Sequence, residues 1–255
     1  VVLRRSSQGH VSTVGLVSLF FFLMIFLKVK FKFIHPLSAA HCFQDKGHFE
    51  VSSPEHLTAH FGKFNLSVLN EPGSKSSWVS KIIIHPDWNP EDETYNADLA
   101  VVVLGEKMKF GIFIKPVCLP SQSDADVTGS GTIAGWGQSK NSMEFYGKHE
   151  ETPNELEMPV VNAAKCYPRF PGLAEIASER MFCAGYDNET KGACFGDSGG
   201  GFYASESQSS QFIVEGIVSS SLLADYTCDV NKYSLYTNVG WFVDWIKDKM
   251  KETEE

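Results

Sequence analysis

From residue 35 onward, short apolar runs alternate with clusters of Gly, Pro, Asn, Asp and Ser. Runs of about four to eight residues bounded by such turn-forming residues are typical of β-strands. The strands predicted on this basis cover residues 82–84, 99–104, 132–134 and 212–218. Helical periodicity is rare, and its best case is a C-terminal helix whose apolar face would carry Trp241, Val243, Trp245, Ile246 and Met250. The pattern predicts an all-β chain with a C-terminal helix.

A proline-flanked segment, Lys115-Pro116-Val117-Cys118-Leu119-Pro120, divides this pattern near its middle. Prolines at both ends favour an extended connector, and a polar stretch follows it. Two β units of about a hundred residues each, an ordinary domain size, would flank the connector. We predict units at residues 35–112 and 129–238, with a linker at residues 113–128.

The first 34 residues have a different character, and we treat residues 1–34 as an atypical N-terminal segment. Residues 14–27 are almost wholly apolar, with Arg4 and Arg5 before them and three lysines after. Fourteen residues are few for a membrane span and fit the core of a signal peptide better. The alternatives are a membrane anchor and an error in the coding sequence assigned to this part.

Charge and cysteine usage limit the class of protein. The formal net charge of −9 argues against nucleic acid or anionic lipid as the main partner, because both require a basic surface. The six cysteines form no CxxC pair and no His lies among them at zinc-finger spacing, so we expect neither a metal site nor a cofactor. Dispersed cysteines and two glycosylation sequons, at Asn65 and Asn188, indicate a secreted, extracellular protein.

The segment with the clearest chemical signal is Gly196-Asp197-Ser198-Gly199-Gly200. Neighbouring glycines allow a serine to sit in a tight turn, with its hydroxyl exposed and the N–H groups of Gly196 and Ser198 directed at one point. Such donors stabilise the oxyanion that forms when a serine attacks a carbonyl group. The alternative is an ordinary glycine-rich loop, which is a weaker explanation for five defined residues.

A serine hydroxyl needs a base, and the base needs a carboxylate to orient it. His41 stands in Ser-Ala-Ala-His-Cys, where small neighbours let the backbone approach the ring. Asp98 precedes an apolar run to residue 104, where burying an acid is costly unless it has a partner. Each residue taken alone has an ordinary alternative explanation. His41 could be a hydrogen-bonded histidine of the core, and Asp98 could be a polar cap at the start of a strand.

Taken together, the motifs AAHC, DLA before an apolar strand and GDSGG resemble those of chymotrypsin-type serine proteases, in the same order His, Asp, Ser. KPVCLP, AGWG, MFCAGY and YTNV also resemble segments of that family, over about residues 35–250. GDSGGG, SAAHCF and CAGYDNET resemble arthropod modular serine proteases of immune and developmental cascades. The resemblance implies a protease domain of two orthogonal six-stranded β-barrels, the first of them incomplete.

The resemblance also implies roles for individual residues. His41 would be the general base, Asp98 its orienting carboxylate and Ser198 the nucleophile, with the oxyanion held by Gly196 and Ser198. The substrate would be a protein or peptide, bound by Gly192, Ala193, Ser219, Ser220, Ser221 and Ser234. Trypsin-like relatives carry Asp where this chain has Gly192, so we predict that cleavage does not follow Arg or Lys, unless Asp225 or Asp229 supplies the charge.

Two disulfides are implied in the same way, Cys166–Cys183 and Cys194–Cys228. In multidomain relatives, the cysteine that corresponds to Cys118 tethers the protease to an upstream light chain.

The chain departs from the family pattern at its N-terminal side. The CGG strand that supplies the partner of Cys42 is missing, and no IVGG-like N-terminus is visible. In the family, the new α-amino group made by activation pairs with the residue that corresponds to Asp197. We therefore expect Asp197 to lack an ammonium partner and the oxyanion loop to resemble that of a zymogen. The competing interpretation is a catalytically incompetent, protease-like binding or regulatory module.

Overall fold

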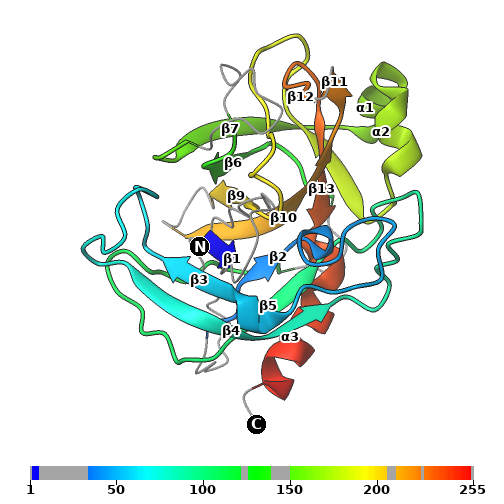
Figure 1. Ribbon diagram of the computed structural model, residues 1–255. Coiled ribbons are helices and arrows are strands. Elements are labelled where there is room, and N and C mark those ends of the chain that lie inside the picture. Colours follow the sequence, from blue (N-terminus) through cyan, green and yellow to red (C-terminus); the bar gives the residue numbers. More distant parts are fainter. Residues whose placement is uncertain are drawn as a thin grey trace.

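The structure is a computed structural model that describes residues 2–5, 34–121, 126–138, 150–205, 211–224 and 227–253. Two β units stand one above the other in Figure 1. The lower unit is a five-stranded antiparallel sheet in the order β1-β3-β4-β5-β2. Its elements are β1 (Val2–Arg5), β2 (Leu37–Ser38), η1 (Ala40–Cys42), η2 (Pro54–His56), β3 (Leu57–Phe61), β4 (Lys75–Ile84) and β5 (Ala100–Leu104).

The upper unit is a closed barrel of six strands in the order β10-β13-β8-β7-β6-β9. Its strands are β6 (Ser130–Gly135), β7 (Asn154–Val161), β8 (Met181–Ala184), β9 (Gly201–Ser205), β10 (Phe212–Ser221) and β13 (Ser234–Asn238). The remaining elements are α1 (Ala163–Arg169), α2 (Pro171–Ile176), the hairpin β11 (Leu223–Ala224) and β12 (Thr227–Cys228), η3 (Val239–Phe242) and α3 (Val243–Glu252). A five-stranded sheet, a closed barrel and a C-terminal helix confirm the predicted all-β class.

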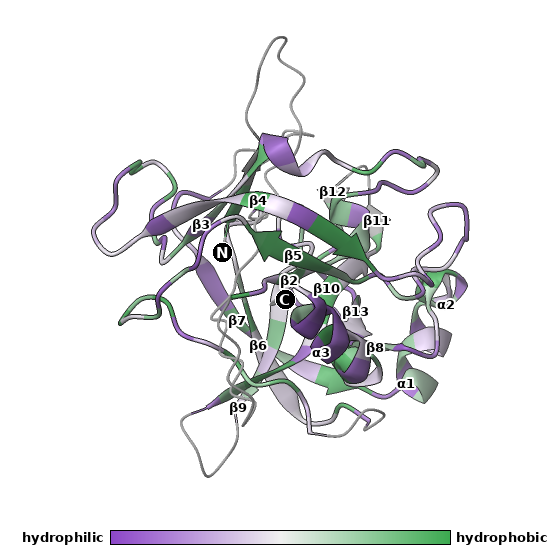
Figure 2. Ribbon diagram, turned by 90° about the horizontal axis from the view of Figure 1, so that it is seen from below, coloured by the Kyte–Doolittle hydropathy of each residue, from purple (hydrophilic) through white to green (hydrophobic). Residues whose placement is uncertain are grey.

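A core of branched aliphatic side chains holds the lower sheet against the C-terminal helix. Val101 and Val102 of β5 are fully buried, and Figure 2 shows β5 as one of the most hydrophobic strands. Val243, Ile246 and Met250 of α3 enter the same core cluster. Packing of this apolar face, rather than helix propensity alone, fixes a helix of ten residues at this place.

Every strand predicted from the apolar runs lies within an observed strand or begins one residue before it. The predicted helix face was wrong for Trp241, which lies in η3 and is 43% exposed. A 3-10 turn has three residues per turn, so Trp241 does not share the phase of α3.

The N-terminal segment contributes a strand that the sequence did not predict, since β1 pairs with β3 from Val2 to Arg5. The apolar run at residues 14–27 lies outside the described residues. In the part of the chain that the structure describes, no helix combines the length and apolar character needed to cross a bilayer.

The centre of the upper barrel is a cluster of three aromatic rings. Phe202 is fully buried, with its ring centroid 5.2 Å from Phe182 and 5.1 Å from Tyr236. Edge-to-face pairs at such separations stabilise a core beyond their buried area. The barrel therefore depends on Phe202 more than on any exposed aromatic residue of the same strands.

We expect Phe202→Ala to lower the free energy of unfolding by about 3–5 kcal/mol, because it leaves a cavity among rings that cannot collapse. The matched control is Phe212→Ala in β10, where the ring is 48% exposed, and it should cost less than about 1 kcal/mol. Urea unfolding followed by tryptophan fluorescence measures both. Equal losses in the two variants would contradict this prediction.

Candidate active site

Asp98 is the most deeply buried charged group of the site, with 0% of its surface exposed. Its Oδ1 accepts a hydrogen bond from the His41 backbone N–H at 2.9 Å, and its Oδ2 lies 2.7 Å from His41 Nδ1. Ser219 donates its hydroxyl to Oδ2 at 2.6 Å. Three donors from two distant segments thus stabilise a carboxylate that would be costly to bury alone.

The backbone around Asp98 is also specialised. Ala97 has a positive φ of 53°, and the Leu99 N–H bonds the Ala97 carbonyl at 2.7 Å. This tight turn directs Asp98 inward immediately before β5 begins. On the other side, Thr237 of β13 donates its hydroxyl to the Asp98 carbonyl at 3.0 Å, so both units hold this residue.

His41 lies in η1, directly after β2, and its ring stands edge-on to Tyr95 with centroids 5.9 Å apart. Because an ionised carboxylate only accepts hydrogen bonds, Nδ1 carries the proton toward Asp98, and in the neutral imidazole Nε2 is the acceptor. Burial lowers the pKa of His41, but Asp98 and Cys42 together raise it further, to well above 6.5. Cys42 Sγ lies 3.8 Å from Nε2.

Ser198 sits in the glycine-rich turn that the sequence predicted, and this turn is anchored to β10. Gly199 N–H bonds the Val218 carbonyl, and Val218 N–H bonds the Gly200 carbonyl, both at 2.8 Å. Gly196 has a φ of 94°, a conformation that favours glycine. In the described part of the chain, no hydrogen bond takes up the N–H groups of Gly196 and Ser198, and none joins Ser198 to His41.

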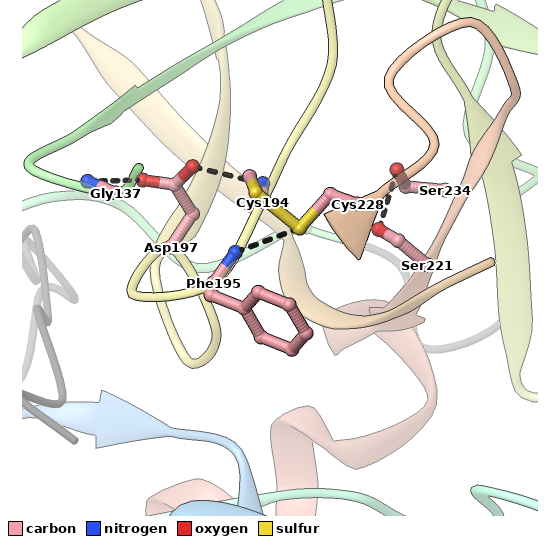
Figure 3. Close-up of a disulfide and its surroundings, with 7 residues drawn as sticks. All are labelled: Gly137, Cys194, Phe195, Asp197, Ser221, Cys228 and Ser234. Carbon is pink, nitrogen blue, oxygen red and sulfur yellow. Dashed lines mark hydrogen bonds between the residues drawn. A yellow bond between two sulfur atoms is a disulfide. The ribbon is translucent and has the colours of Figure 1, made fainter. Parts of the chain in front are cut away.

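Asp197 is a second, partly buried carboxylate, and it has a poorer set of partners. Among the described residues, its hydrogen-bond donors are the N–H groups of Gly137 and Cys194, at 3.1 and 3.0 Å (Figure 3). Burial raises its pKa to about 6, although these two hydrogen bonds oppose the shift. A cavity of about 310 Å³ adjoins the carboxylate. Lys191 lines this cavity, but its ammonium faces Glu189 at 3.4 Å, and no described cation pairs with Asp197.

Four of the residues predicted to bind substrate lie on the neighbouring strands β10 and β13, and Figure 3 shows two of them, Ser221 and Ser234, near the Cys194–Cys228 disulfide. Ser221 and Ser234 are cross-strand neighbours, and their hydroxyl oxygens lie 2.8 Å apart. Ser220 pairs with the backbone of Leu235 in the same ladder. Ser219 makes a different contact, because its hydroxyl donates a hydrogen bond to Asp98. That hydroxyl is therefore engaged with Asp98 rather than directed at a substrate.

Gly192 and Ala193 form the other side of this region. Ala193 is 1% exposed, and a Cβ on Gly192 would lie 3.3 Å from the Val230 backbone. Asp229 bonds Lys232 at 2.8 Å, so its charge already has a partner. Asp225 lies outside the described residues.

The cysteines divide into two pairs and two free thiols. Cys166–Cys183 and Cys194–Cys228 are disulfides, as predicted. Cys42 and Cys118 are both half-exposed thiols. The sequons lie in loops, with Asn188 exposed and Asn65 half-exposed.

Three contacts of the site could not be found from the motifs alone. The Ser219 and Thr237 hydroxyls hold Asp98 from strands far away in sequence. One feature of the sequence pointed to the Cys42 contact with Nε2. Cys42 directly follows His41, and the CGG strand that would supply its disulfide partner is not found in the sequence. Within the described residues, no three His, Cys, Asp or Glu side chains are arranged to hold a metal ion.

The raised pKa of Asp197 predicts how the free energy of unfolding depends on pH. The carboxyl has a pKa of 3.8 when unperturbed and about 6 in the fold, so the folded state keeps the proton to higher pH. Its contribution to stability therefore falls as pH rises from about 4 to about 6 and stays low above that. Asp197→Asn removes the buried charge and should raise the free energy of unfolding by up to about 3 kcal/mol at about pH 8, with no gain below about pH 4.

Urea unfolding at both pH values measures this difference, with the exposed Asp126→Asn as control. A loss of stability at about pH 8 would contradict the prediction, because it would reveal a cation bound to the carboxylate.

Comparison with known proteins agrees with this geometry. The sequence model of the family described as Trypsin matches residues 32–246. Serine protease gd of Drosophila melanogaster is 31% identical over 240 residues, which cover 82% of this chain and 44% of that protein. The suppressor of tumorigenicity 14 protein homolog of Bos taurus is 32% identical over 212 residues, 83% of this chain and 23% of that protein.

Mannan-binding lectin serine protease 1 of Mus musculus is 31% identical over 169 residues, 66% of this chain and 22% of that protein. The chain thus spans less than half the length of these curated relatives. Its match to the family model covers most of its own length, from before η1 into α3. The chain therefore belongs to the trypsin family.

Proposed function

We propose that residues 35–250 form the protease domain of a secreted serine endopeptidase, with barrels at residues 35–112 and 129–238 and a linker at 113–128. His41 is the general base, Asp98 orients it, and Ser198 is the nucleophile. The domain acts on protein or peptide substrates in an extracellular proteolytic cascade. It cleaves after residues other than Arg and Lys.

The reaction follows from the positions of these groups. Ser198 Oγ attacks the carbonyl carbon of the scissile bond while its proton passes to His41 Nε2, and the N–H groups of Gly196 and Ser198 receive the oxyanion. His41 then gives the proton to the leaving amine, and the C–N bond breaks to leave an acyl-enzyme. Water, deprotonated by His41, hydrolyses this ester and restores Ser198.

The observation that carries the proposal is the buried contact between Asp98 and His41 Nδ1 at 2.7 Å. Asp98 fixes the tautomer in which Nε2 accepts a proton, and it stabilises the imidazolium that forms. The N–H groups of Gly196 and Ser198 support the same mechanism, because no acceptor among the described residues takes them up and they are available to an oxyanion.

The disulfides, the sequons and the lengths of the relatives bear on the surroundings of the domain. Two disulfides and two sequons, at Asn65 and Asn188, support an oxidising, extracellular setting and glycosylation. Serine protease gd and mannan-binding lectin serine protease 1 are longer proteins that the chain covers only in part. Cys118 has a free, half-exposed thiol that an upstream light chain would bind through a disulfide.

A second candidate function is a protease-like binding or regulatory module without turnover. Asp197 favours it, because this carboxylate lies in the turn that carries the oxyanion donors and finds two backbone donors and no cation among the described residues. Cys42 favours it too, since its thiol lies against the Nε2 that should accept the Ser198 proton.

A fluorophosphonate probe separates the two functions, because only an activated Ser198 reacts rapidly with it. We expect the full-length protein, after proteolytic activation, to be labelled at Ser198 and to hydrolyse peptides. Ser198→Ala should lose labelling and on the order of 10⁶ in kcat. The chain of residues 1–255 expressed alone should label poorly, because no cation among the described residues pairs with Asp197. Normal peptidase activity in Ser198→Ala would refute the assignment.

The raised pKa of His41 predicts the pH dependence of activity. A general base must be neutral, so kcat/KM should rise with pH and reach half its maximum at a pH above 6.5. Asp98→Asn should abolish most activity. It should also lower the pH at which the remaining kcat/KM is half its maximum, because the negative charge that raises the pKa of His41 is gone. Initial rates on one peptide from about pH 5 to about pH 10 test this, and a plateau already reached near pH 6 would contradict it.

A further inference from the structure

Lys46 lies shortly after His41 in the chain and reaches across to the loop that joins β4 to β5. Its ammonium group donates hydrogen bonds to the carbonyl oxygens of Asn89 and Asp92, at 3.4 and 2.5 Å, and to that of Thr94. A lysine ammonium has three donors, and these carbonyl groups take them up. We call this arrangement, Lys46 with the carbonyl groups of Asn89, Asp92 and Thr94, the lysine clamp.

Two aromatic rings complete the surroundings of the ammonium group. Its nitrogen lies 4.7 Å from the ring centroid of Trp88 and 4.9 Å from that of Tyr95. Burial lowers the pKa of Lys46, whereas the charges of Asp92 and Asp98 oppose this shift. A partly desolvated cation interacts more strongly with carbonyl dipoles and ring faces than an exposed cation does. The clamp is therefore a fixed contact, unlike that of a solvated surface lysine.

The backbone on both sides of the clamp favours this contact. The Gly47 N–H bonds the Pro90 carbonyl at 2.8 Å, directly beside Lys46. Asp92 Oδ1 accepts a hydrogen bond from the Thr94 N–H at 3.0 Å, which folds the loop so that its carbonyl groups converge. The clamp thus joins the loop after η1 to the loop after β4.

The far end of the clamped loop lies against the imidazole of His41. Tyr95 stands edge-on to His41, with ring centroids 5.9 Å apart, and its N–H bonds the Ile176 carbonyl of α2 at 2.8 Å. The imidazole is therefore held by Asp98 through Nδ1 and by the Tyr95 ring at its side. Because a catalytic group misplaced by about 1 Å can cost on the order of a hundredfold in rate, this ring contact bears on catalysis.

We propose that Lys46 is a positioning residue for the catalytic base: through the clamp it fixes Tyr95 against His41, so that the imidazole keeps the orientation set by Asp98. The inference rests on the proposed function and adds a residue to its mechanism. Lys46 acts through the Tyr95 ring, which its ammonium group contacts and which in turn contacts His41. Its removal should therefore weaken catalysis only as long as that ring is present.

The test is a double-mutant cycle on the full-length protein after proteolytic activation. Each variant gives a rate constant for fluorophosphonate labelling of Ser198, which needs the base but no bound peptide, and kcat and KM for one peptide. Lys46→Met keeps the length of the side chain but removes its charge and donors. It should lower the labelling rate and kcat about tenfold. KM should change little, because the clamp orients the base.

The second arm of the cycle removes the ring. Tyr95→Leu should lower the labelling rate by a factor similar to that of Lys46→Met. The double variant should be no slower than the slower single variant, because the two residues act in series. Losses that multiply in the double variant overturn the inference, since they would mean that the Lys46 charge acts on Asp98 directly.

The control is Lys81→Met in β4, an exposed lysine of the same unit, which should leave the labelling rate and kcat unchanged. A labelling rate in folded Lys46→Met within about twofold of the wild-type rate overturns the inference but not the proposed function. If Lys46→Met does not fold, Lys46→Gln, which keeps two donors, takes its place in the cycle. Wild-type protein that is not labelled overturns the proposed function and the inference with it.

Discussion

The need to satisfy a buried negative charge at Asp98 brings the two β units of this molecule together. The side chain takes donors from η1 of the lower unit and from β10 of the barrel, and its carbonyl takes one from β13. Removing any donor would leave part of a charge unsolvated in a site where water does not enter. The position of the imidazole, and hence the direction of its free nitrogen, follows from this set of bonds.

The partly buried carboxylate of Asp197 lacks such a set of donors. Asp197 has two backbone donors and no described cation, and its pKa of about 6 expresses the cost of keeping it charged. Asp98 thus forms a complete internal network, whereas Asp197 needs a partner that the described residues do not supply. The site combines a histidine that Asp98 orients through a full set of hydrogen bonds with an oxyanion turn in which the charged form of Asp197 is unfavourable.

The sequence predicted those features that depend on local pattern. Apolar runs located the strands, and short motifs located His41, Asp98 and Ser198. It did not predict α1 and α2, which are short and interrupted or begun by Pro168 and Pro171, so that no helical period could be counted. The Ser219 contact with Asp98 and the Ser221–Ser234 pair depend on register between strands, which single-sequence patterns do not specify.

Trp136 joins the two units, because its indole N–H bonds the Phe64 carbonyl at 3.0 Å and its ring packs against Val2. It is flanked by Gly135 and Gly137, and a Cβ at either position would overlap the Asp197 carboxylate. These two positions therefore have no tolerated substitution that keeps the carboxylate in place. A larger residue at either position can arise only after Asp197 has moved or been replaced by a smaller residue, so the order of substitutions matters: Asp197 can change first, but neither glycine can.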